Sequence, residues 1–166
     1  FCLVGSEMCI RDSSNPVSLF ETRLALVKSG LKKGDRVGTI APNTSEHLEL
    51  LYAISGFGGV AHTINPRLFP DEVVYIINHA CDRILFVDPA YVGILIGHRH
   101  LFESVERIYI TGPKQNEIAA RMNGFEFLVD LLEKGDPDYA WPELDEEDAA
   151  VVCYTCLLYT SPSPRD

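Results

Sequence analysis

The 166 residues carry 24 acidic and 14 basic side chains, a formal net charge of −10, and 46% of the residues are hydrophobic. This composition is typical of one globular domain, and its acidity argues against nucleic acid as a partner, because like charges repel. No apolar run approaches the roughly 20 residues of a membrane-spanning helix. The first six residues lack the basic start and apolar stretch of a secretion signal.

The first half of the chain predicts two helices around a short strand. Apolar residues in Val17–Leu31 recur at helical spacing, which indicates an amphipathic helix. An apolar strand is expected over 36–41, ended by Pro42, and one of the polar residues 43–45 can cap a second helix that runs to about Ile54. The residues of this helix expected to face inward are Leu48, Leu51, Tyr52 and Ile54.

The remaining elements alternate in the same way. A second strand is predicted over 60–64, and the Pro-Asp-Glu sequence at 70–72 suits the first turn of a helix that continues to His79. The later predictions are strands over 83–87, 107–111 and 149–154, a short helix over 125–132, and a surface linker over the Pro- and acid-rich stretch 134–148.

Strands that alternate with helices require crossover connections, so the chain is predicted to have an α/β fold with a mostly parallel sheet flanked by helices. Ligands of such sheets bind at the carboxyl ends of the strands. No G-x-G-x-x-G or Walker sequence follows any predicted strand. The glycines within 56–59 end a helix rather than begin one, so they are not expected to hold a phosphate.

Several polar residues each allow two interpretations. His62 could be a base or a residue of a substrate cavity, or a hydrogen-bonded structural residue of a buried strand. Arg67 could bind an anion or anchor its proline-rich loop. His98 and His100 could form half of a metal site, but no third ligand lies nearby, so a solvated loop is the favoured interpretation and no metal site is predicted.

Both ends of the chain are predicted to be foreign to the protein. One DNA encoding of Leu3–Ser13 has a reverse complement that encodes CLLYTSPSPR, which is the sequence of Cys156–Arg165. This relation resembles a sequencing adapter that was read through and translated at both ends, and such segments are left out of fold reasoning. We therefore expect non-native tails over 1–14 and 156–166 and a native segment over 15–155. The alternative is that both ends are genuine loops.

The cysteines point to a reducing compartment. Cys153 and Cys156 form a C-x-x-C pair, but Cys156 lies in the second tail, so we interpret the pair as accidental. Within the native segment Cys81 and Cys153 are too few for a disulfide framework. A cytoplasmic location is the resulting prediction.

Three stretches carry a resemblance to a known family. They are GLKKGDRVGTIAPNTSEHLELLYAISGFGGV (30–60), HTINPRLFPDEVVYIINHACDRILFVD (62–88) and DYAWPELDEEDAAVVCYT (138–155), together about half of the chain. They resemble the adenylate-forming (AMP-binding) acyl-CoA synthetases, and the second stretch resembles the fatty-acyl-CoA ligase branch in particular. The resemblance implies that 15–155 is a partial N-terminal AMP-binding domain.

The resemblance also implies a reaction. The intact relative would form an acyl-adenylate from a carboxylate and ATP with Mg²⁺, and would then transfer the acyl group to CoA. In that family a strand reading CYT continues as SGTTGxPKG, whose hydroxyls, glycine backbone and lysine hold the phosphates. Here the match ends at Cys156, so Thr155 is the single nucleotide-binding residue carried over, and no catalytic or metal-binding residue is assigned.

The chain itself is therefore expected to be inactive and to bind none of these cofactors well. Two other functions stay open, namely a non-catalytic flavodoxin-like binding module and an adenylating ligase for aryl acids. A homodimer is the candidate assembly.

Overall fold

The structure, a computed structural model, describes residue 26 and residues 29–112, 114, 124–132 and 142–154. In this part of the chain six strands form one sheet in the order β5-β4-β3-β1-β2-β6, and each neighbouring pair is parallel. The strands are β1 (Arg36–Ile40), β2 (Val60–Thr63), β3 (Ile84–Val87), β4 (Arg107–Ile110), β5 (Phe125–Phe127) and β6 (Val151–Cys153).

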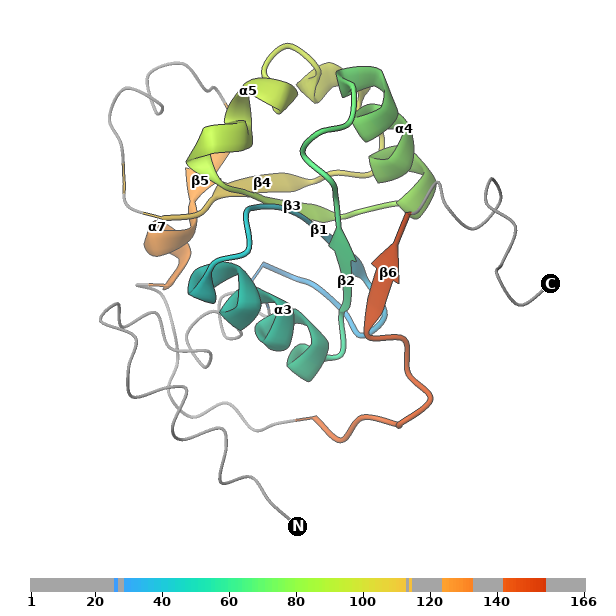
Figure 1. Ribbon diagram of the computed structural model, residues 1–166. Coiled ribbons are helices and arrows are strands. Elements are labelled where there is room, and N and C mark those ends of the chain that lie inside the picture. Colours follow the sequence, from blue (N-terminus) through green and yellow to red (C-terminus); the bar gives the residue numbers. More distant parts are fainter. Residues whose placement is uncertain (1–25, 27–28, 113, 115–123, 133–141, 155–166) are drawn as a thin grey trace, which may run out of the picture.

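Helices cover both faces of the sheet (Figure 1). One face carries α3 (Ser45–Phe57), and the other carries α4 (Pro70–Ala80) and the short α5 (Val92–Leu95). The smaller elements are the 3₁₀ turns η1 (Pro89–Tyr91) and η2 (Arg99–Leu101) and the helix α7 (Leu128–Leu132). None of the helices in the described ranges is both long and apolar enough to span a bilayer.

The side chains of the strands alternate between two apolar clusters, one on each face. Val37, Ala61 and Phe86 join the cluster under α3, whereas Ile40 and Leu85 join the cluster under α4 and α5. Burial on both faces explains why these strands are apolar without a polar alternation. The predicted α/β fold with a parallel sheet flanked by helices is therefore confirmed.

The chain order makes β1 the switch point of the sheet. β2 lies on one side of β1, and the chain then passes back across to place β3 on the other side. The two connecting helices, α3 and α4, consequently lie on opposite faces. The crevice at the carboxyl ends of such diverging strands is where ligands of open α/β sheets bind.

Two details differ from the prediction. Residues 125–127 were expected to be helical but form β5, because Phe125 and Phe127 alternate at strand spacing and pair with Ile108 and Ile110 of β4. Helix α7 begins only at Leu128.

The inward face of α3 also differs. Leu48 and Tyr52 were expected inside but are 55% and 61% exposed. The buried stripe runs instead along positions i, i+3, i+4 and i+7, and it consists of Leu50, Ala53, Ile54 and Phe57. The helix continues past Gly56 and ends at Gly58, which adopts the left-handed conformation at φ 93°.

Two predicted segments fall largely outside the described residues. Of the helix predicted over 17–31, the structure describes Leu26, which is helical and fully buried, and residues 29–31, which are not helical, so the helix ends before residue 29 and not at Leu31. Of the linker predicted over 134–148, residues 142–148 are described and all are exposed, as a surface linker should be.

Candidate functional site

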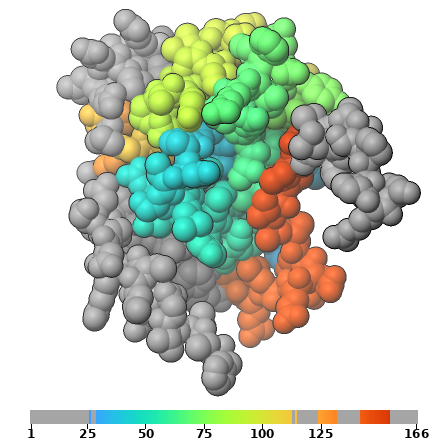
Figure 2. Space-filling model, viewed as in Figure 1, coloured from blue at the N-terminus to red at the C-terminus, as the bar shows by residue number. Residues whose placement is uncertain are grey.

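A cavity of about 720 Å³ lies at the carboxyl ends of β1, β2 and β6. Its walls are the loop after β1, the first turns of α3, the loop after β2 and the last residues of β6. In Figure 2 α3, in cyan to teal, and β6, in orange-red, reach the same visible face of the molecule. The residues that line the cavity are Ala41, Asn43, Thr44, Ser45, His47, Leu48, Leu51, Thr63, Ile64, Asn65, Pro66, Cys153 and Tyr154.

The start of α3 is fixed by hydrogen bonds next to this cavity. Thr44 is the N-cap, one of the three residues predicted for that role, and its hydroxyl accepts from the backbone N–H of His47 at 3.2 Å. The His47 ring lies between two oxygens, with Nδ1 3.2 Å from the carbonyl oxygen of Pro42 and Nε2 3.0 Å from Oγ1 of Thr39. The imidazole therefore ties the loop after β1 to the strand itself.

The contacts of His47 also determine its tautomer. The carbonyl of Pro42 can only accept, so Nδ1 carries the proton of that contact. The hydroxyl of Thr39 has one proton and lies between two acceptors of the neutral state, Nε2 of His47 at 3.0 Å and the carbonyl oxygen of His62 at 3.4 Å. Burial lowers the pKa of His47, and the hydrogen bond to Pro42 opposes this effect. His47 is thus a neutral residue that shapes the cavity wall, and the sequence analysis did not single it out.

The ends of β2 and β6 are joined by side chains. Oγ1 of Thr63 lies 3.0 Å from Sγ of Cys153, one strand across. Asn65 Oδ1 accepts from the backbone N–H of Arg67 at 3.0 Å and closes the following turn. Arg67 itself is exposed and does not line the cavity, so its proposed anion contact stays a prediction.

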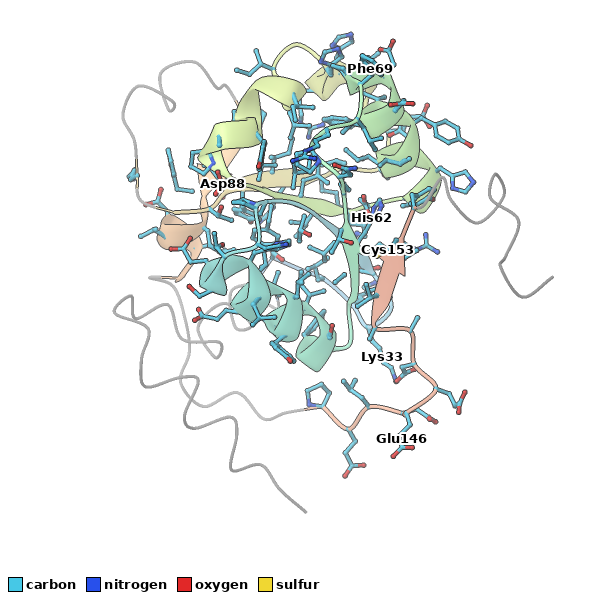
Figure 3. The ribbon with its side chains drawn as sticks, viewed as in Figure 1. Lys33, His62, Phe69, Asp88, Glu146 and Cys153 are labelled. Atoms are coloured by element: carbon cyan, nitrogen blue, oxygen red, sulfur yellow. The ribbon has the colours of Figure 1, made fainter. Side chains whose placement is uncertain are left out.

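His62, labelled in Figure 3, lies on β2 directly before Thr63, which lines the cavity. Its side chain and that of Asp82 are both 0% exposed, and Nδ1 of His62 lies 2.7 Å from Oδ2 of Asp82. Burial raises the pKa of Asp82, and the hydrogen bond and charge of His62 oppose that rise. Because His62 does not line the cavity, its contact with a substrate stays a prediction, whereas its place in a buried polar pair is direct.

This buried pair needs space that β1 provides. Gly38 is paired with His62 of β2, and a Cβ at position 38 would lie 2.9 Å from Oδ2 of Asp82. Within the described part of the chain, Nε2 of His62 and Oδ1 of Asp82 have no hydrogen-bond partner. Sequence reasoning found His62 but missed Asp82, because the two residues are 20 positions apart.

Tyr154 is the third residue, after His47 and Asp82, to which the sequence analysis gave no role in the site. It follows β6, lines the cavity, and its hydroxyl lies 2.5 Å from Nδ1 of His79 on α4. Its ring packs against His62 with 5.2 Å between the ring centroids. Burial is the largest cause that raises the pKa of Tyr154, followed by the charge of Asp82.

The remaining predicted site residues are not brought together. No group of three or more metal-binding side chains occurs among the residues that the structure describes. Asp88 caps the turn η1 by accepting from the N–H of Ala90 at 2.8 Å. Asp148 is paired with Lys33 at 2.6 Å. Thr155 lies outside the described residues.

The cavity wall is more apolar than polar and carries no fixed positive charge among its described residues. Its lining consists of hydroxyls, amides, a thiol, a neutral imidazole and aliphatic carbons, with no lysine or arginine among the described lining residues. A triphosphate is held by converging N–H groups and cations. The described residues alone therefore do not fit the phosphates of a nucleotide.

Sequence relatives are acid–CoA ligases. A 3-methylmercaptopropionyl-CoA ligase of Ruegeria lacuscaerulensis is 47% identical over 131 residues, which are 79% of this chain and 24% of that protein. A medium-chain-fatty-acid–CoA ligase of Ectopseudomonas oleovorans is 40% identical over 131 residues, again 79% of this chain and 24% of that protein. The chain thus spans about a quarter of the length of these relatives.

Solved structures show the same fold. A long-chain-fatty-acid–CoA ligase from Archaeoglobus fulgidus matches with a TM-score of 0.71 at 22% identity, over 83% of this chain and 26% of that chain. The anthranilate CoA ligase AuaEII, solved with anthranoyl-AMP, matches with a TM-score of 0.69 at 22% identity, over 78% of this chain and 24% of that chain. The model of the AMP-binding enzyme family matches residues 23–156, most of the sequence. The chain therefore belongs to the AMP-binding enzyme family.

Proposed function

We propose that this chain is the N-terminal portion of an ATP-dependent ligase that joins an aliphatic carboxylic acid to CoA through an acyl-adenylate. The observation that carries the proposal is the 47% identity to a 3-methylmercaptopropionyl-CoA ligase over 131 residues. The 40% identity to medium- and long-chain fatty-acid–CoA ligases extends the candidate substrates to fatty acids. The aryl-acid alternative rests on 22% identity to an anthranilate CoA ligase, a likeness that supports the fold alone.

We further propose that the chain by itself is inactive and that residues 1–14 and 156–166 are not native. The cavity at the strand ends lacks a basic side chain among its described residues, and Thr155 is all that the sequence retains of the phosphate motif. ATP and Mg²⁺ would be held by residues of the intact enzyme, where the metal would offset the phosphate charge. The complementary coding of the two ends supports the assignment of the tails.

A cytoplasmic location and a homodimer complete the proposal. Cys81 and Cys153 are both exposed and unpaired in the described structure, which suits a reducing compartment. Sedimentation of the intact enzyme would test the dimer.

The function is tested by restoring the coding sequence downstream of Thr155 and assaying acyl-CoA formation with ATP and Mg²⁺. The carboxylates compared should be 3-methylmercaptopropionate, medium- and long-chain fatty acids, and anthranilate. We expect turnover with the aliphatic acids and none from the present chain, measured by pyrophosphate exchange. A restored protein that activates no carboxylate would favour a non-catalytic binding module, and turnover by the present chain would refute its proposed inactivity.

Thr155→Ala in the restored enzyme tests the one nucleotide contact that the sequence retains. The substitution should slow adenylation about 10- to 100-fold, as expected for one hydrogen bond to the reacting phosphates. His100→Ala is the matched control, because His100 is exposed and distant in sequence from every lining residue. An unchanged adenylation rate in the Thr155→Ala enzyme would remove Thr155 from the phosphate site.

A further inference from the structure

A chain of hydrogen bonds leads from the cavity wall into the sheet. His47 lines the cavity, and its Nε2 lies 3.0 Å from Oγ1 of Thr39 on β1. Thr39 is 1% exposed, and its Oγ1 lies 3.4 Å from the backbone oxygen of His62 on β2. The side chain of His62 continues the connection to Asp82 at 2.7 Å. The hydroxyl of Thr39 is therefore the link between a cavity residue and the buried pair.

This hydroxyl has one proton to share between two acceptors. It can donate either to Nε2 of His47 or to the carbonyl oxygen of His62. While His47 is neutral and its proton is on Nδ1, Nε2 offers a lone pair at the shorter of the two distances. The hydroxyl proton is therefore expected to point to His47 in the neutral state.

Protonation of His47 removes one of these acceptors. In the imidazolium both ring nitrogens carry a proton, so Nδ1 keeps its bond to the carbonyl of Pro42 and Nε2 becomes a donor to Oγ1 of Thr39. The hydroxyl proton must then turn away from the ring, and the carbonyl oxygen of His62 is the acceptor that remains beside it in the described structure. The change requires the rotation of one hydroxyl and no rearrangement of the backbone.

We propose that His47, Thr39 and the carbonyl of His62 form a pH-sensitive switch, in which protonation of His47 at the cavity wall transfers the hydrogen bond of the Thr39 hydroxyl to β2. Strands β1 and β2 thereby gain a side-chain hydrogen bond near their carboxyl ends, next to the cavity. The same proton brings a positive charge to a lining whose described residues otherwise carry none. The switch goes beyond the ligase function and does not depend on it, because all of its groups belong to the present chain.

The surroundings of His47 allow its charge to change with pH. Titratable groups lie on its own helix, at the end of β6 and in the core behind Thr39, and they are Glu46, Glu49, Cys153, Tyr154, His62 and Asp82. Arg67, in the loop after β2, is exposed and does not line the cavity. Burial lowers the pKa of His47 against the effect of a backbone hydrogen bond, and neither cause is a charged side chain. The ring should therefore take up its proton below the ordinary midpoint of pH 6.5.

NMR spectra of the present chain, labelled with carbon-13 and nitrogen-15, test the switch as the pH is lowered from neutral. The ring signals of His47 give its midpoint. The carbonyl carbon of His62 should move downfield with the same midpoint, because such a carbon is deshielded when its oxygen accepts a further hydrogen bond. Thr39→Val has a similar shape but no hydroxyl, so His47 should still titrate while the carbonyl carbon moves much less. Thr39→Ser, which keeps a hydroxyl, should restore the movement.

His47→Ala tests the same transfer without acid. This variant removes the acceptor at neutral pH, so the Thr39 hydroxyl should turn to His62 and its carbonyl carbon should lie downfield of the wild-type position. Adding Thr39→Val to His47→Ala should abolish that displacement. The comparison decides the question even where acid unfolds the chain before His47 titrates.

Three results would overturn the switch. They are a His47 titration that leaves the carbonyl carbon of His62 in place, an equal movement of that carbon in Thr39→Val, and a His47→Ala chain in which that carbon is not displaced. Equal movement in Thr39→Val would assign the effect to titration of His62 or Asp82 instead. Each of these results leaves acyl-CoA formation by the restored enzyme unaddressed, and an inactive restored enzyme would leave the switch intact, so the two proposals fail separately.

Discussion

Replacing Gly38 by alanine should destabilise the protein strongly, because the middle of β1 has no room for a side chain. A Cβ at this position would lie 2.5 Å from Cδ2 of Leu85, 2.9 Å from Oδ2 of Asp82 and 3.2 Å from Cδ1 of Ile64. Leu85 and Asp82 are both 0% exposed, so neither can move aside into solvent. Such overpacking costs about 1–3 kcal/mol, and we expect the upper half of that range.

The cost would be larger if the new methyl group displaced Asp82. Oδ2 of Asp82 is held by Nδ1 of His62 in the core, and leaving a buried polar group without its hydrogen-bond partner costs about 1–3 kcal/mol more. The free energy of unfolding from urea titrations measures both contributions. A larger loss than overpacking alone would show that the pair itself has been broken.

Gly93→Ala is the matched control for this substitution. Gly93 lies in α5, and a Cβ there would meet nothing within 4 Å. Alanine is favoured over glycine in a helix by up to about 1 kcal/mol, so this variant should be as stable as wild type or more stable. If Gly38→Ala were as stable as wild type, the tight fit around the His62–Asp82 pair would be wrong.

Two further predictions concern His47 and the tails. Burial holds the pKa of His47 below its ordinary 6.5, so the unfolded chain takes up this proton first as the pH falls. The stability that His47 contributes should be complete above about pH 6.5 and should be lost as the pH falls through the folded pKa. Over that range the melting temperature of His47→Gln should therefore depend less steeply on pH than that of wild type. Deletion of residues 1–13 should leave the melting temperature nearly unchanged, because we propose that this segment is not native; an unfolded deletion variant would contradict that.

The sequence predicts the sheet well because its strands are recognisable one at a time. A buried parallel strand is a short apolar run between turn residues, and β1 and β3 have that form. The strand β5 has three residues, so the alternation of Phe125 and Phe127 is too short to distinguish it from the start of a helix without its pairing with β4. A prediction from neighbouring residues in the sequence contains no information about which distant strand a segment pairs with.

The buried side of α3 was predicted wrongly for a related reason. Its apolar residues surround much of the helix, so several stripes could face the core. The choice of Leu50 and Ile54 over Leu48 and Tyr52 is made by the sheet against which the helix packs. Propensity and capping predict that the helix exists and starts near Thr44, whereas packing decides which side is buried.

The site was predictable in location but not in its contacts. The carboxyl ends of β1 and β2 were expected to form the binding edge, and the cavity lies there. The partners of His62 come from two other elements, Asp82 after α4 and Tyr154 after β6. Neither position has a signature in the sequence, because an aspartate after a helix and a tyrosine after a strand are both ordinary.

The buried aspartate gives a last prediction with a definite sign. Burial raises the pKa of Asp82 above its ordinary 3.8, against the opposing effect of His62. The unfolded chain therefore releases this proton at lower pH than the folded chain, and the stability that Asp82 contributes is complete below about pH 4 and declines as the pH rises through the folded pKa. Asp82→Asn removes the ionisation and retains an oxygen that can accept from Nδ1 of His62. The free energy of unfolding of wild type relative to this variant should fall with rising pH, at most by about 1.4 kcal/mol per pH unit, the limit for one proton. Urea titrations at a series of pH values measure this difference. A difference that stays constant, or grows in favour of wild type, would mean that the core does not disfavour the charged form of Asp82.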